Sequence, residues 1–191
     1  MTLDAVFNRM LDVIENNIVP ITRQGVADGH KVFGAAVLLK KDLSLVLAGT
    51  NHELECPLWH GEVYTIKEFY RMENRPDPAD CVFLSTHEPC SMCLSSIAWA
   101  GFPEFYFLFS YEDTKDSFSI PHDIKMIKEV FLCDAPSREN SFYKAHPLVE
   151  MIPSLSDPEG AKERIAKIQD EYDELSRTYQ ARKDDNSIPL K

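Results

Sequence analysis

The stretches His60-Gly61-Glu62 and Pro89-Cys90-Ser91-Met92-Cys93 determine how the rest of this chain must be arranged. Together they follow the pattern H-x-E…P-C-x-x-C, in which one imidazole and two thiolates can bind Zn²⁺ while the carboxylate stays free for proton transfer. Three protein ligands leave a fourth tetrahedral position for water, as in catalytic zinc sites. We therefore predict a zinc site with His60, Cys90 and Cys93 as ligands and Glu62 as its proton carrier.

The spacing of these residues indicates how they meet. Cys90 and Cys93 stand three apart at the expected start of a helix, so that both sulfurs project from one face, and the positive helix N-terminus favours their thiolate forms. His60 and Glu62 open the preceding amphipathic run, which extends to Tyr70. The sequence thus predicts that two helix N-termini meet at one metal ion.

Each motif alone has other interpretations. A lone C-x-x-C in an intracellular protein can equally be a redox dithiol or half of a closed structural zinc site. A lone H-x-E carries almost no information. The combination in this order, with Pro89 before the first cysteine and a βα unit between the motifs, favours the catalytic interpretation.

Strand-like and helix-like segments alternate along the chain. The expected strands are 32–39, 43–48, 81–85, 105–109 and 147–152. The expected helices are 3–18, closed by Pro20, then 60–73, 91–101, a segment beginning at Pro121, and 159–182. This order permits a three-layer α/β/α sandwich around a mixed five-stranded sheet.

Composition limits the class of protein. The 191 residues are 44% hydrophobic and 27% charged, which suits one globular domain with a substantial core. Because no apolar run is long enough for a membrane span and the first residues lack a signal-peptide pattern, we expect a cytoplasmic protein. The net charge of −11 disfavours nucleic acid as a partner, since phosphate contacts need basic groups. Five cysteines without secretory signals argue against a disulfide framework.

The two motifs, with Thr86-His87-Glu88 directly before the second one, resemble the zinc-dependent cytidine and deoxycytidylate deaminase superfamily. The resemblance extends from about Val32 to about Leu155. It implies the cytidine deaminase-like α/β/α fold and hydrolytic deamination of an amino-substituted base. It also places Asn51 where members have an asparagine that contacts the base, although a plain turn residue is the alternative.

Other substrate contacts are expected around the motifs. Trp59 either covers a base or supports the start of the helix, and Glu88 either accepts hydrogen bonds from the substrate or caps the following helix. His87 is either a pocket wall or a plain loop residue. The predicted substrate-binding set is Asn51, Phe33, Glu88, Trp59, Trp99 and Asp116, with Phe118 and His122 as further candidates.

We divide the chain into a deaminase core over 1–156, a C-terminal helix over 157–183 and a flexible tail over 184–191. Apolar residues of the helix step by three and four in a heptad-like seam. The helix either packs on the core or forms a dimer contact, and we expect a homodimer.

The substrate expected from the resemblance is a small base or nucleoside. Ile97-Ala98-Trp99-Ala100 and Asp116-Ser117-Phe118 resemble guanine deaminases, which sets guanine-like substrates slightly ahead of cytosine-like ones. One alternative is a tRNA adenosine deaminase. The alternative of another class is a non-catalytic zinc-binding interaction protein, in which Cys56 would close the zinc site.

Overall fold

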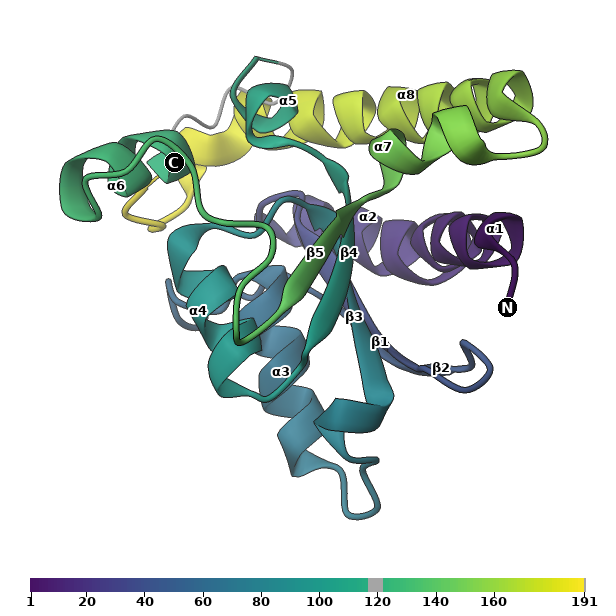
Figure 1. The fold of residues 1–191 in the computed structure, drawn as a ribbon. Helices are drawn as coiled ribbons and strands as arrows, with labels where there is room; N and C mark the ends of the chain where they lie inside the picture. Colours follow the sequence, from purple (N-terminus) through teal and green to yellow (C-terminus); the bar gives the residue numbers. More distant parts are fainter. Residues whose placement is uncertain (117–121, 191) are drawn as a thin grey trace.

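The computed structural model describes residues 1–116 and 122–190. It contains a mixed five-stranded sheet with helices on both faces (Figure 1). The strand order is β2-β1-β3-β4-β5. β1 runs antiparallel to both of its neighbours, whereas β3, β4 and β5 are parallel to one another. The strands are β1 (Gly34–Leu39), β2 (Leu45–Thr50), β3 (Cys81–His87), β4 (Glu104–Phe109) and β5 (Lys144–Pro147). The predicted fold class is confirmed.

The helices form the outer two layers. α3 and α4 cover one face of the sheet, while α1, α2 and α8 lie over the other (Figure 1). None of the helices described is both long and apolar enough to cross a bilayer. Their bounds are α1 (Leu3–Val13), α2 (Val19–Asp28), α3 (Gly61–Arg71), α4 (Ser91–Trp99), α5 (Tyr111–Asp116), α6 (His122–Val130), α7 (Leu148–Met151) and α8 (Pro158–Arg182), with shorter turns η1 (Ile14–Ile18), η2 (Pro78–Asp80), η3 (Ile152–Ser154) and η4 (Lys183–Asp185).

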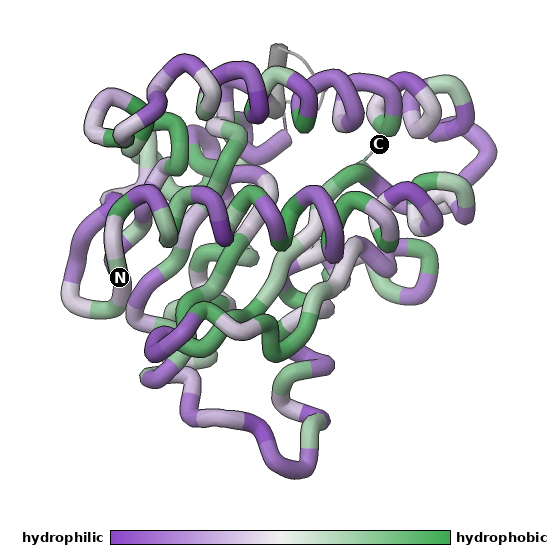
Figure 2. The backbone as a smooth tube through the Cα atoms, turned by 90° about the vertical axis from the view of Figure 1, so that its right-hand side faces the viewer, coloured by the Kyte–Doolittle hydropathy of each residue, from purple (hydrophilic) through white to green (hydrophobic). Residues whose placement is uncertain are grey.

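The central strands are apolar throughout because both of their faces are buried. Side chains alternate along a strand, so Phe83 packs under α3 and α4 while Leu84 packs under α1 and α8. On β4, Phe107 and Leu108 likewise belong to the cores on opposite faces of the sheet. In Figure 2 these strands form the hydrophobic centre of the molecule, and hydrophilic turns of α8 lie above them. The sheet therefore has a core on each side.

Pro20 does not end the first helix, contrary to the prediction. A proline lacks the N–H that would bond four residues back, and its ring clashes with that carbonyl. η1 avoids this conflict because it is a wider π-helical turn, in which the Val19 N–H bonds to the Ile14 carbonyl, five residues earlier. α2 then continues to Gly29, which ends it with a φ of 105°.

The last strand lies earlier than predicted. β5 ends at Pro147, and the following apolar residues, beginning with the buried Leu148, form α7. β5 stands last in the order of the sheet, beside β4, and is therefore an edge strand, where a proline without an N–H is tolerated. The sequence predicts a strand over 147–152 because a short apolar run has no clear period that would distinguish a strand from a helix.

α8 packs on its own chain. The seam residues Ile168, Tyr172, Leu175 and Tyr179 are buried in the same apolar cluster as α1 and α2. The seam residues therefore pack against the core of the same chain, on the side of α8 that faces the sheet. In the segment after α8, Ile188 is buried and Asn186 Nδ2 donates a hydrogen bond to the Gly29 carbonyl. The flexibility of this tail stays a prediction.

Leu175→Ala tests whether α8 is part of the core. Removing this buried side chain should lower the free energy of unfolding by about 2–5 kcal/mol, because a cavity remains under the helix. The matched control is Arg177→Ala on the exposed side of the same helix, which should change it by less than about 0.5 kcal/mol. Equal effects in denaturant unfolding would mean that α8 is not docked.

Candidate active site

The N-termini of α3 and α4 meet at one point. His60 directly precedes α3, Cys90 directly precedes α4, and Cys93 lies in the first turn of α4. The Cys90 sulfur lies 3.6 Å from Nδ1 of His60, and the ligand atoms of all three residues are within 4.8 Å of one another. The structure thus brings together the three residues that the motifs predict as metal ligands.

Gly61 allows α3 to begin this close to the sheet. A Cβ atom at this position would lie 2.8 Å from the Phe33 carbonyl oxygen and 2.9 Å from the Cα of Gly34, both backbone atoms of the β1 region. The side chain of Asn51 also fixes the start of α3, since its Oδ1 accepts a hydrogen bond from the Gly61 N–H. A larger residue between His60 and Glu62 would push the helix start away from the cysteines.

Glu62 is buried beside the three residues and is not part of their group. Ser85 on β3 donates a hydrogen bond of 2.9 Å to Oε1 of Glu62 and so fixes the orientation of the carboxyl group. Burial raises the pKa of Glu62, and the negative charge of Cys90 raises it further. The acid expected to carry protons therefore lies next to the predicted ligands.

The donor set fits a zinc ion. A hydrogen bond from Cys93, together with the neighbouring His60, lowers the pKa of Cys90 well below its ordinary value, which favours a thiolate. Burial raises the pKa of Cys93, since a second negative charge without a cation is unfavourable there. One imidazole and two sulfurs in a buried cluster are ligands that Zn²⁺ prefers, and a bound cation would stabilise both thiolates.

A cavity of about 280 Å³ opens directly beside His60 and Cys90. Its apolar wall includes Phe33 and Met92 and is completed by Ile188 and other residues of the C-terminal segment. The cavity thus has a largely apolar wall, with the predicted ligands His60 and Cys90 at one side.

Three charged residues of this cavity were not singled out from the sequence: Lys31, Glu53 and Asp123. Burial raises the pKa of Asp123 to about 7, and the Cys90 charge contributes to the shift. No local pattern marks these residues, because Lys31 precedes β1, Glu53 follows β2 and Asp123 lies on α6. The fold alone brings them to one cavity.

The predicted substrate contacts divide between this cavity and other places. Phe33 and His122 line the cavity. Asn51 is fully buried, with Oδ1 bonded to Gly61 and Nδ2 donating to Glu53 at 2.7 Å, so it supports the site from behind. Its contact with a base stays a prediction.

Glu88 and Trp59 have structural partners instead of facing the cavity. The Glu88 carboxylate accepts a hydrogen bond from the Tyr111 N–H at the start of α5 and lies 3.4 Å from Nε of Arg138. It therefore caps α5, and not α4 as the alternative had it. Lys67 of α3 lies 3.8 Å above the ring of Trp59, which supports the helix start and does not line the cavity.

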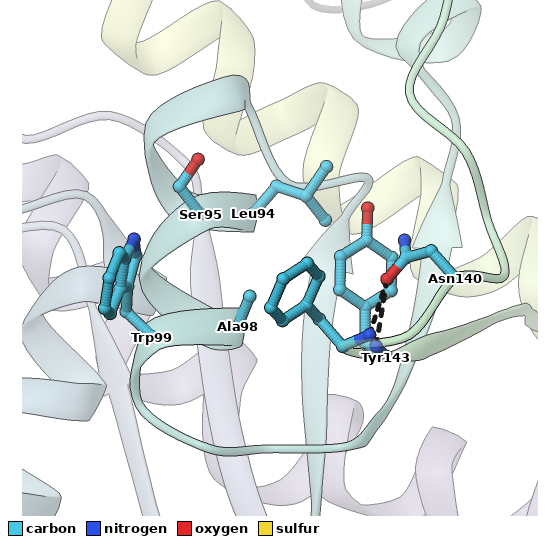
Figure 3. A pocket seen from close by; sticks show the side chains of 7 residues that line it. Leu94, Ser95, Ala98, Trp99, Asn140 and Tyr143 are labelled. Atoms are coloured by element: carbon cyan, nitrogen blue, oxygen red, sulfur yellow. Dashed lines mark hydrogen bonds between the residues drawn. The ribbon is translucent and has the colours of Figure 1, made fainter.

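Trp99 lies away from the predicted metal site. Its side chain is 91% exposed and borders a second cavity, of about 570 Å³, between α4 and the segment before β5 (Figure 3). This cavity contains none of the predicted metal ligands. Trp99 projects from the outer side of α4 and does not face the cavity beside His60 and Cys90, so its contact with a substrate stays a prediction.

The remaining candidates have different outcomes. His87 is the last residue of β3 and is buried between Phe33 and Tyr172, so it is neither a pocket wall nor a loop residue. Burial lowers its pKa to about 3, which keeps the ring neutral. Asp116 ends α5, but its side chain and Phe118 lie outside the described residues. Cys56 does not join the metal-binding group found in the described part of the chain.

Cys93→Ala tests the metal group. We expect bound zinc to fall from stoichiometric to negligible amounts, because two ligands hold the ion far less well than three. Cys81→Ala is the matched control, since it also removes a buried thiol but lies outside the group. Metal analysis of both purified variants distinguishes the outcomes, and full zinc content in Cys93→Ala would contradict the assignment.

Comparison with known proteins agrees with this geometry. Residues 18–109 match the family model described as the cytidine and deoxycytidylate deaminase zinc-binding region. Over 87 residues the chain is 28% identical to the guanine deaminase of Bacillus subtilis (strain 168), which covers 44% of this chain and 54% of that protein. The chain thus matches about half the length of this curated relative.

Solved structures show the same fold. A guanine deaminase from Nitrosomonas europaea superposes with a TM-score of 0.56 at 19% identity, covering 86% of this chain and 81% of that one. The Bacillus subtilis guanine deaminase structure gives a TM-score of 0.51 at 25% identity over 72% of this chain and 86% of that one. Over residues 18–109 this chain is thus similar to the zinc-binding region of cytidine and deoxycytidylate deaminases.

Proposed function

We propose that this protein is a zinc-dependent hydrolytic deaminase, which converts an amino-substituted nucleobase or nucleoside to its oxo product and releases ammonia. The observation that carries the proposal is the arrangement around the cavity: His60 and Cys90 line it, Cys93 belongs to the same group of ligand atoms, and Glu62 is buried beside them. His60, Cys90 and Cys93 would hold the zinc ion. When bound, Zn²⁺ supplies hydroxide at neutral pH by lowering the pKa of water toward about 7.

The chain itself moves the protons. Glu62 accepts one proton of the attacking water at its carboxylate and transfers it to the ring nitrogen beside the C–NH₂ carbon. It then accepts the remaining proton of the added hydroxyl and delivers it to the amine, so that the C–N bond breaks, the C=O bond forms and ammonia leaves. Ser85 keeps one oxygen of this carboxylate in place during both transfers. The buried position of Glu62 excludes bulk water from the transfer path.

Several features favour a small substrate. The cavity volume is near the lower end of the range of about 300–1,000 Å³ for small-molecule sites. Ile188, Pro189 and Leu190 form part of its wall, and the net charge of −11 repels a polyanion. A base or nucleoside therefore suits the site better than tRNA, and the relatives that carry the name guanine deaminase put guanine-like substrates first.

The interpretation as a non-catalytic zinc protein requires a closed metal site. No fourth His, Cys, Asp or Glu with a described side chain, in residues 1–113 or 122–190, joins the group of His60, Cys90 and Cys93. The site also adjoins a cavity large enough for a ligand. Both observations support an open coordination position.

Glu62→Gln separates metal binding from chemistry. We expect ammonia release to fall by about 10²- to 10⁴-fold, because the amide cannot carry the proton, while zinc content stays unchanged. Glu68→Gln on the same helix is the control and should keep full activity, since it lies on the outer surface of α3. Undiminished turnover in the Glu62 variant would contradict its role.

Substrate recognition is tested with a panel of purine, pyrimidine, pterin and triazine amines. We expect a free purine with a guanine-like amidine to react best, and Asp123 to accept hydrogen bonds from its N–H groups. Asp123→Asn should raise KM by roughly 10- to 150-fold, the effect of a hydrogen bond to a charged group, while the exposed control Asp134→Asn should not. A silent panel, together with salt-sensitive RNA binding, would favour the tRNA alternative.

A further inference from the structure

A buried ion pair lies directly behind the predicted metal ligand His60. Lys31 Nζ is 2.9 Å from Oε1 of Glu53, and the two side chains are only 4% and 1% exposed. Lys31 comes just before β1 and Glu53 just after β2, and the pairing of Gly34 with Thr50 brings these two ends together. Replacing a buried ion pair with apolar residues is often neutral or even stabilising, so the pair needs an explanation other than stability.

The carboxylate of Glu53 is held from three sides. Asn51 Nδ2 donates a hydrogen bond of 2.7 Å to Oε2, and Lys31 binds Oε1. The third neighbour is His60, whose Nε2 lies 3.5 Å from the same Oε1. Lys31 and Asn51 therefore fix a carboxylate that faces the outer nitrogen of the imidazole.

The two nitrogens of His60 face different groups. Nδ1 is directed at the cysteines, 3.6 Å from the Cys90 sulfur, whereas Nε2 is directed at Glu53. A neutral imidazole carries its proton on one nitrogen only, and a carboxylate attracts the proton to the nitrogen it faces. A proton on Nε2 leaves the lone pair of Nδ1 free on the side of the cysteines.

We propose that Glu53, held by Lys31 and Asn51, is a positioning residue that fixes the ring and the proton of His60 for metal binding through Nδ1. The proposal rests on the proposed role of His60 as a zinc ligand. It does not require Glu53 to touch substrate. The loop after β2 thereby acts on the metal site through His60, and the buried lysine keeps the carboxylate oriented.

The test measures zinc affinity in the full chain by competition with a chromophoric chelator. Glu53→Gln should weaken zinc binding by about 10- to 100-fold, as removal of an outer-shell partner does elsewhere. Glu55→Gln is the matched control, because it makes the same change two residues later, where the side chain is 53% exposed. The absorption spectrum of bound Co²⁺ should also change in the Glu53 variant and not in the control.

A second variant separates positioning from folding. Glu53→Gln leaves Lys31 as an unpaired buried charge, which destabilises the fold. The double variant Lys31→Met/Glu53→Gln removes that charge and should recover thermal stability while zinc binding stays weak. If zinc affinity recovers together with stability, Glu53 is only a structural residue and the proposal is overturned.

The two proposals can fail separately. Wild-type protein that binds no zinc would contradict the proposed function itself. Wild-type protein that binds zinc and releases ammonia, with unchanged zinc affinity in both Glu53 variants, would overturn the positioning role alone.

Discussion

Two helices that begin at the same point in space are the constraint on which this structure depends. α3 starts after His60 and α4 starts after Cys90, so the positive ends of both helices point at one small volume. Such a junction is unfavourable unless negative charge lies there. A thiolate at Cys90 supplies that charge, and a bound zinc ion would stabilise a second thiolate at Cys93.

The sheet places this junction. α3 and α4 share one face of the sheet, and β1 and β3 carry Gly34 and Ser85 next to Gly61 and Glu62. The helix start can approach β1 only because position 61 has no side chain. Each residue of the H-G-E motif thus has its own function: a predicted ligand, a close approach and a predicted proton carrier.

The sequence predicted the parts of the molecule that depend on local pattern. The succession of strands and helices along the chain, the two helix starts and the gathering of His60, Cys90 and Cys93 follow from apolar runs and fixed spacings. Local pattern failed at Pro20, which does not end the first helix, and at 147–152, where the expected strand is mostly a helix. The other differences concern tertiary contacts. Trp99, Glu88 and Trp59 have residue types that suit a base, but their neighbours are an outer cavity, α5 and Lys67. Conversely, Glu53 and Lys31 acquire their position only when the ends of β1 and β2 meet.

The open coordination position is the central claim, because it separates a catalytic zinc site from a structural one. X-ray absorption spectroscopy of the zinc-loaded protein measures it most directly. The account predicts two sulfur neighbours at about 2.3 Å and two lighter neighbours at about 2.0–2.1 Å, one from His60 and one from solvent. A third or fourth sulfur neighbour would show a closed site and contradict the account.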